Sequence, residues 1–544
     1  MDGPPTQEAA RQLEDLMQAI DDLRRRVQAL EQRSVATSSE PTTPIAHPAV
    51  HSEIPPDLST GLLAGLGRLL LGIAGAYLLR AVTEAGILPQ LAGTLAGLLY
   101  AGAWLVSSVR IASHNRLIIA LQGLTACLIA GPLLWEATAR FHTLSPAGAA
   151  AALALFVVLG QVVAWRRDHS LIAGVTALAG CATAIALIIA KLHLAPFAVA
   201  LLIAAAVAEY GACRDRAVGM RWIVALAADF CAFLLIYVAT RPQGLPEGYA
   251  PISWIAVIAI PMALAAIYLS STVTRTLIRR LPMTWFEMSQ VATVVALAIV
   301  GGLRVAHGAS AGVAAIGSAC LAAGAISYLV SFTKLTRRPA IGRNFHAYAT
   351  FGLLLIAWAS LLLFPTGIRA ALWIALGLAA TWLGEQRNGN TLRMHGAAYL
   401  AATLSVSGLV CLMATAFGYA ITLRRRQNTW AARVAPAVLA ALLCWSIVQL
   451  PVTLFSGPFI SVSRTALIAA IAMVLAWCGR RWNLPELIWI LYPWMTLGAV
   501  KLFIEDFQQE RSAILFLSLL LYGSALLVLP RLVRRAIPAQ SDLS

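Results

Sequence analysis

Long apolar runs constrain this chain more than any other feature. From Gly61 almost to the C-terminus, apolar runs of roughly 17–25 residues follow one another, and that length spans the hydrocarbon core of a bilayer. In lipid, every backbone polar group must find its partner inside the spanning structure, so such runs form helices or barrel strands. The runs are rich in Leu, Ala, Ile and Val without alternation, which excludes barrel strands. The sequence therefore predicts an all-α, polytopic transmembrane helical bundle.

Composition supports this fold class and argues against binding of nucleic acid. The 544 residues are 60% hydrophobic and 12% charged, too little charge to cover a soluble protein of this length. The formal net charge is +16, but most Lys and Arg stand in short turns between apolar runs, as topology signals do. No basic soluble domain carries a groove-reading motif, so nucleic acid is not an expected partner. The lipid bilayer is the expected partner.

The chain divides into five predicted parts. Residues 1–6 form a disordered N-terminus, residues 7–33 a short cytoplasmic coiled-coil helix, and residues 34–58 a disordered linker with five prolines. Residues 59–535 form the multi-pass transmembrane domain, and residues 536–544 a short C-terminal tail. No cleaved signal peptide is predicted, because the N-terminus has no charged region followed by a short apolar region.

The predicted coiled coil has a regular heptad seam. Its members are spaced alternately three and four apart, with β-branched residues at the a positions and leucines at d, which favours parallel dimers. The seam consists of Leu13, Leu16, Ile20, Leu23, Val27 and Leu30. Fewer than three heptads fit, and short helices are marginal alone. Two interpretations stay open: the helix joins a second copy or a partner helix, or its seam packs on the protein's own surface.

Seventeen apolar segments are candidate membrane spans, and the sequence is compatible with 16 to 18 crossings. The loops after the second, fourth, sixth, eighth, tenth and twelfth segments hold sixteen Lys and Arg, and the alternate turns hold six. By the positive-inside rule, the N-terminus is cytoplasmic. The rule then fails at Arg424–Arg426, because counting the segments places this basic cluster outside the cell. Later basic clusters nevertheless favour a cytoplasmic C-terminus. The run 394–421 is either a re-entrant pair of half-helices broken near 405–408 or one long helix.

Three charged residues inside apolar segments are candidate functional groups, because a charge left in lipid costs several kcal/mol. Asp229 lies near the middle of its segment, Arg68 about two turns into the first segment, and Glu209 near the end of the sixth. One interpretation pairs Asp229 with Arg68 on a substrate or proton path. The other, which we favour, is a protonated or hydrogen-bonded Asp229 that holds helices together.

A second charged cluster lies between the last two apolar segments, in KLFIEDFQQER. Its candidate residues are Lys501, Glu505, Asp506 and Arg511. We expect an external turn, with Lys501 reaching outward to water and spaced for an i, i+4 pair with Glu505. We also expect Asp506 to accept a hydrogen bond from Lys501, Arg511 or a neighbouring loop. Elsewhere, Glu136 and Arg140 are spaced for a pair on one helix face.

Motifs for metal and cofactor chemistry are lacking in the sequence. The eight cysteines are scattered without a CxxC pair, so neither a zinc site nor a disulfide framework is expected. There is no GxxxxGK[ST] loop and no HExxH motif, which argues against ATP-driven transport within this chain and against zinc proteolysis of that type. We expect no metal, no cofactor and no enzymatic activity.

Two stretches resemble a known family. Gly65–Pro89 contains Gly75, Tyr77, Leu78, Leu79 and Arg80, and Lys501–Leu527 contains Lys501, Asp506, Arg511 and Gly523. These patterns are similar to the first span and the closing signature of a widespread family of bacterial multi-pass membrane proteins of unknown function. Members typically start with a short coiled coil and a Pro-rich linker. The resemblance implies this architecture, and no activity comes with it. The chain departs from the pattern at Ala81, where an aromatic residue is common.

These patterns lead to three hypotheses about function. The first is a non-enzymatic scaffold or envelope-associated protein of the bacterial inner membrane, with both termini cytoplasmic. The second is a secondary transporter or a lipid or solute flippase that uses Asp229, Arg68 and a broken helix at 394–421. The third, an intramembrane enzyme, ranks last because few titratable groups lie within the apolar segments.

Overall fold

The computed structural model divides the chain into two units, residues 1–61 and residues 62–544. It describes residues 56–108, 116–216, 219–335, 342–387, 389–403, 409–424, 429–454, 459–506 and 512–534, together with residues 21, 25, 26 and 28. All six residues of the predicted heptad seam lie outside this part, so the coiled coil stays a prediction. Arg511 lies outside it too.

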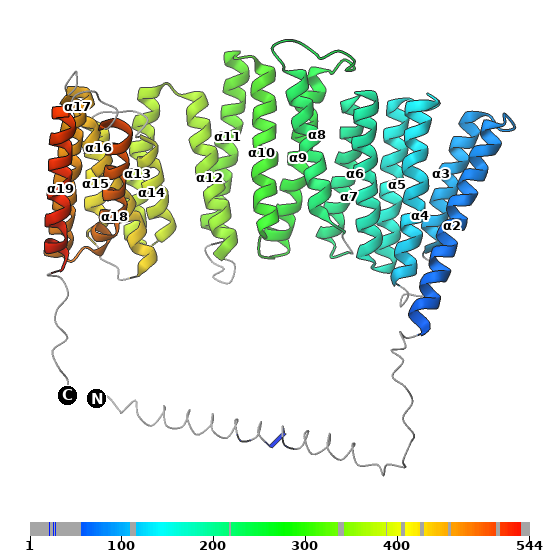
Figure 1. Ribbon diagram of the computed structural model, residues 1–544, viewed down its shortest axis with the longest axis horizontal. Helices are drawn as coiled ribbons and strands as arrows, with labels where there is room; N and C mark the ends of the chain where they lie inside the picture. The colour runs from blue at the N-terminus through cyan, green and yellow to red at the C-terminus, as the bar shows by residue number, and fades with distance from the viewer. Residues whose placement is uncertain are drawn as a thin grey trace. The chain divides into compact units, whose positions relative to one another are not determined.

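The described part of the second unit is all-α, as expected. It contains no strand, and its helices succeed one another with short connections (Figure 1). The first half comprises α2 (Pro56–Glu84), α3 (Gln90–Ser107), α4 (Arg116–Trp135), α5 (Pro146–Arg167), α6 (Ser170–Lys191), α7 (Leu194–Cys213), α8 (Arg221–Ala239), α9 (Trp254–Val273) and α10 (Trp285–Ala306). The second half comprises α11 (Ser310–Val330), α12 (Gly342–Leu363), α13 (Thr366–Gln386), α14 (Asn390–Ala402), α15 (Leu409–Thr422), α16 (Trp430–Leu454), α17 (Phe459–Arg481), α18 (Pro485–Lys501) and α19 (Ser512–Arg534).

Sixteen of these helices are long and apolar enough to cross a membrane. Four of the helices continue directly into π-helical turns: η2 (Glu136–Arg140), η3 (Thr274–Ile278), η4 (Ser331–Leu335) and η7 (Leu502–Asp506). The expected number of spans was seventeen, and the difference arises in the segment 394–421.

That segment forms two half-helices, α14 and α15, so the alternative of one long helix is wrong. A Cβ atom on Gly418 would lie 2.8 Å from Leu400 Cδ1, whereas residues eighteen apart in one straight helix are separated by about 27 Å. The half-helices therefore lie beside each other, and both pack against α13 and α16 (Figure 1). At about 20 Å each, neither crosses the roughly 30 Å of a hydrocarbon core. Sixteen helices of sufficient length and hydropathy to cross a membrane remain, an even number.

Packing follows chain order within this unit. Consecutive helices form antiparallel hairpins such as α5–α6, α11–α12 and α13–α14, and contacts also join next-but-one helices such as α4–α6, α5–α7 and α7–α9. The largest buried cluster spans α4 to α10 and is rich in alanine, with Ala149, Ala184 and Ala232 fully buried. Small residues let helix backbones approach closely, which is how helices associate in lipid.

Large apolar side chains lie mainly on the outside of the second unit. Ile255, Trp285 and Leu527 are each at least 75% exposed, and many more Leu, Ile, Phe and Trp residues share their faces. The buried set contains polar and charged residues, including Asp506 and Arg393, which are at most 1% exposed. Exposed apolar side chains in such number differ from the surface of a soluble domain, where large exposed apolar patches are rare.

Candidate functional site

The terminal charged cluster is organised by a π turn. After α18 ends at Lys501, the chain continues as η7, in which hydrogen bonds join residues five apart. This spacing brings Lys501 and Asp506 to one face, where an α-helix would bring Lys501 and Glu505 together. The face points toward the first turns of α17, and Asp506 is fully buried there.

Lys501 and Asp506 form a closed hydrogen-bonded cluster with α17. Lys501 Nζ lies 2.6 Å from Asp506 Oδ1 and 2.7 Å from Ser461 O, Ser461 Oγ and Thr465 Oγ1. Asp506 also accepts from the hydroxyls of Ser461 and Thr465. The expected hydrogen bond from Lys501 to Asp506 is therefore present. The expectation that Lys501 reaches outward is wrong, because its ammonium points inward and its side chain is only 10% exposed.

Glu505 has a different partner from the expected one. Its carboxylate pairs with Arg464 of α17 at 3.0 Å, so the predicted Lys501–Glu505 pair does not form. This second pair is half-exposed at the edge of the helices, next to the buried Lys501–Asp506 pair. Two ion pairs thus join the end of α18 to the start of α17, and the four charges cancel. Ser461 is 2% exposed, so its hydroxyl serves as an internal hydrogen-bonding group.

The structure separates two of the residues proposed for an intramembrane site. Asp229 of α8 is buried and accepts a hydrogen bond of 2.9 Å from Gln290 Nε2 of α10. Arg68 lies on α2, where it is exposed. Among the contacts of the described residues, the two are not brought together. Gln290 was not predicted as the partner of Asp229, because no local sequence pattern marks an amide on a neighbouring helix as a hydrogen-bond donor.

Glu209, the third of these residues, belongs to an ion-pair cluster at the end of α7. Arg221, the first residue of α8, donates to both of its carboxylate oxygens at 3.0 and 2.8 Å. Ser271 of α9 donates to Glu209 Oε2 at 2.5 Å. The carboxylate is 3% exposed and is shared by three helices. It therefore joins α7, α8 and α9 at one edge of the bundle.

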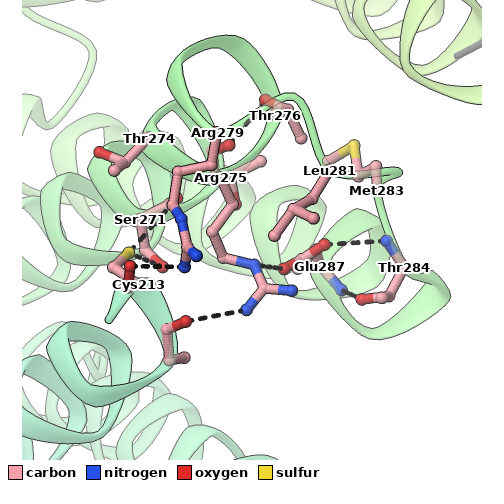
Figure 2. A network of polar contacts seen from close by, with 12 residues as sticks. Cys213, Ser271, Thr274, Arg275, Thr276, Arg279, Leu281, Met283, Thr284 and Glu287 are labelled. Atoms are coloured by element: carbon pink, nitrogen blue, oxygen red, sulfur yellow. Dashed lines mark hydrogen bonds and ion pairs between the residues drawn. The ribbon is translucent and has the colours of Figure 1, made fainter. Parts of the chain in front are cut away.

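A related network lies next to it around Glu287 (Figure 2). Glu287 and Thr284 form a reciprocal capping box at the start of α10. Arg275 Nε lies 2.6 Å from Glu287 Oε1, and Figure 2 shows this guanidinium between η3 and the start of α10. Arg275 also donates to the carbonyl of Ala212 at 3.3 Å. The ion pair of Glu287 with Arg275 therefore adds a contact between helices to its role at the helix terminus.

Arg279 extends the network into the loop that follows α7. It donates to the carbonyl of Cys213 at 2.7 Å and to Asp215 Oδ1 at 2.9 Å. This hydrogen bond to Arg279 holds the pKa of Asp215 below its usual range. The loops after α7 and α9 are therefore tied together by basic residues of the kind that the charge rule counts.

The most deeply buried ion pair joins α13 to α14. Arg393 is 1% exposed, and its Nε and Nη2 atoms lie 2.8 and 3.1 Å from the two carboxylate oxygens of Glu385. Gly384 and Gly396 allow the two helices to approach, since a Cβ atom on Gly396 would lie 2.2 Å from Thr381 Oγ1. Sequence reasoning missed this pair because Arg393 stands close to a turn and was counted as a loop charge.

Another pair corrects a prediction for α4. Glu136 lies 2.8 Å from Arg80 Nη1 of α2, and Arg80 Nε also pairs with Glu84 at 3.0 Å. Arg140 instead lies over the ring of Phe141, with its Cζ 5.3 Å from the ring centre. The expected Glu136–Arg140 pair is not formed, because residues 136–140 are a π turn rather than an α-helical turn.

Within the described part of the chain, no group of three or more His, Cys, Asp or Glu could hold a metal ion. The eight cysteines are free thiols. The buried carboxylates of Glu209, Glu287, Glu385 and Asp506 each lie against an Arg or Lys side chain.

Comparisons with known proteins add little to this description. No family model and no curated protein matches the chain. A solved structure described as a circular tandem repeat protein with novel repeat topology and enhanced subunit contact surfaces is similar over 87% of this chain and 98% of its own, at 12% identity. Its TM-score is 0.27, so the similarity carries no argument about fold or function.

Proposed function

We propose that this chain is a non-enzymatic scaffold protein of the bacterial inner membrane, with sixteen crossings and both termini in the cytoplasm. The distribution of apolar residues supports the membrane placement, because many large apolar side chains cover the outside while charged side chains lie in the interior. The resemblance of both ends of the chain to a bacterial multi-pass family agrees with it. The positive-inside rule supports the orientation.

The half-helices α14 and α15 remove the conflict between the positive-inside rule and the basic cluster at Arg424–Arg426. If they enter and leave the bilayer on one side, Arg424–Arg426 lie on the same side as the clusters at Arg480–Arg481 and Arg531–Arg535. The number of full crossings is then even. Both ends of the domain, and the basic cluster at Arg531–Arg535, belong to the cytoplasmic face in this topology.

The single observation that favours a scaffold over a transporter is the pairing of the buried charges. Asp506, Glu385, Glu209 and Glu287 each lie against a cation of a neighbouring segment, and Asp229 is hydrogen-bonded to Gln290. Such pairs fix helix positions. A transported ion or solute needs a polar group that exchanges partners near the midplane. A transporter that uses α14 and α15 remains the second candidate, because broken helices are typical of transporter binding sites.

The scaffold function requires a binding element, and the N-terminal heptads are the proposed one. They favour a parallel dimer with a second copy of the chain. We expect the full chain in mild detergent to have the mass of a dimer, and a chain lacking residues 1–33 to have the mass of a monomer. Light scattering coupled to size-exclusion chromatography measures both masses.

A matched pair of substitutions controls for unrelated effects of the truncation. Leu16→Asp with Leu23→Asp places charges in the seam and is expected to give the monomer mass. Gln28→Asp adds a charge at an exposed helical position and is expected to leave the dimer intact. If the truncated chain and the seam variant keep the mass of the full chain, the heptads do not join two copies.

A further inference from the structure

A cavity between α2, α3 and α4 opens beside the ion pairs of Arg80 with Glu84 and Glu136 described above. Its volume is about 320 Å³, within the range of small-ligand pockets. The three walls come from the end of α2, the start of α3 and the end of α4 with η2. Gly93 and Gly97 of α3 form part of the wall, and they let α3 pack closely, since a Cβ atom would lie 2.2 Å from Thr83 Oγ1 at Gly93 and 2.5 Å from Leu133 Cδ2 at Gly97.

The cavity has a polar end and an apolar end. The polar end holds Arg80, Glu84 and Glu136, at the positions where α2 and α4 finish. The apolar end is lined by Ile73 and Leu128, each about two turns or more from the polar residue of its own helix. Ile73 precedes Glu84 by eleven residues, which corresponds to about 16 Å along the helix. One leaflet of a hydrocarbon core is about 15 Å deep, so the cavity spans one leaflet from its surface to its middle.

The outer wall of this cavity is open to the surroundings of the bundle. Tyr77 is 62% exposed and Leu128 is 46% exposed, and both line the cavity. An apolar chain can therefore leave sideways between these residues and continue along the outside of α2 and α4. The shape suits an amphiphile better than a compact solute.

The charges at the polar end select the headgroup. One guanidinium stands between two carboxylates, so the cluster carries a net charge of −1. An anionic headgroup without a cation would face both carboxylates. A headgroup with a phosphate and a primary ammonium matches all three residues: the phosphate accepts from Arg80, and the ammonium donates to Glu84 and Glu136. A quaternary ammonium cannot donate these hydrogen bonds.

We propose that this cavity binds one phospholipid with a primary-amine headgroup, phosphatidylethanolamine in chemical class, in the leaflet opposite to the N-terminus. The proposal rests on the membrane placement given above. The lipid joins α2 to α3 and α4 through its headgroup, and its chains cover the apolar end of the cavity.

Lipid binding to the purified, delipidated full chain in detergent tests this proposal. Native mass spectrometry with dioleoyl lipids of three headgroups, ethanolamine, choline and glycerol, measures the bound fraction of each. We expect ethanolamine lipid to bind with about tenfold higher affinity than either other lipid, the difference expected from lost charge-assisted hydrogen bonds. Equal affinity for the three lipids, or a preference for the glycerol lipid, would overturn the proposal.

Variants locate the binding site. Glu136→Gln is expected to reduce the preference for ethanolamine lipid over choline lipid. Ile73→Phe narrows the apolar end and is expected to weaken the binding of all three lipids without changing the order of their affinities. The matched control is Arg304→Gln, which removes an exposed charge from the end of α10, away from the cavity. An equal effect of Arg304→Gln would place the preference outside the cavity. A chain that fails to fractionate with membranes contradicts the membrane placement, which is a separate result.

Discussion

Asp506→Ala is expected to lower the free energy of unfolding by about 3 kcal/mol, because removal of one partner leaves a buried charge without compensation. Lys501 would keep only the oxygens of Ser461 and Thr465 in a side-chain environment that is 10% exposed. The same change frees the start of α17 from the end of α18. The midpoint temperature of unfolding, followed in detergent by loss of the monodisperse peak, measures the effect.

The neighbouring carboxylate supplies the control for Asp506. Glu505→Ala removes a half-exposed pair with Arg464 and is expected to cost less than about 1 kcal/mol. The double variant Asp506→Leu/Lys501→Met removes both buried charges and is expected to recover most of the lost stability. If Asp506→Ala changes the midpoint no more than Glu505→Ala does, the buried pair does not hold the last helices together.

Arg393→Met is expected to destabilise the chain by about 3 to 5 kcal/mol, because Glu385 would stay buried without its cation. Arg393→Lys is expected to recover little of this, since an ammonium cannot reproduce the bidentate contact of a guanidinium. The effect should be largest around α13 and α14, where the glycine contacts depend on the closeness of the two helices. Hydrogen exchange of these two helices in detergent provides the measurement.

Two substitutions complete this series. Arg387→Met, at an exposed position in the same turn, is expected to change stability by less than about 0.5 kcal/mol. Arg393→Met/Glu385→Leu removes both charges and should restore exchange protection. Equal protection in Arg393→Met and in the wild-type chain would show that the ion pair does not fix the hairpin.

Hydropathy predicted the helical architecture well, because each apolar run carries its own signal. The break after Ala402 was also accessible, since the basic cluster at Arg424–Arg426 conflicted with one long helix. The sequence left the choice between the alternatives open. Contacts such as that between Leu400 and Gly418 decide it, and they depend on how two half-helices lie beside each other.

Charge partners were harder to predict than helices. The pair of Lys501 and Asp506 was expected because both residues stand in one short segment. The partners of Glu209, Glu136 and Asp229 lie on other helices, and helix order alone does not bring specific side chains together. The π turns explain the two wrong local pairs. In both, an i, i+4 spacing was assumed where the backbone follows an i, i+5 pattern.

Topology mapping tests most directly the claim that sixteen helices cross the membrane and that α14 and α15 do not. Single cysteines at Arg387, Arg424, Asn483, Gly244 and His307 can be placed in a chain whose eight native cysteines are replaced. A membrane-impermeant maleimide should label Arg387→Cys, Arg424→Cys and Asn483→Cys from one side and Gly244→Cys and His307→Cys from the other. Labelling of Arg424→Cys and Asn483→Cys from the side of Gly244 would show that α14 and α15 cross the bilayer together and would contradict this account.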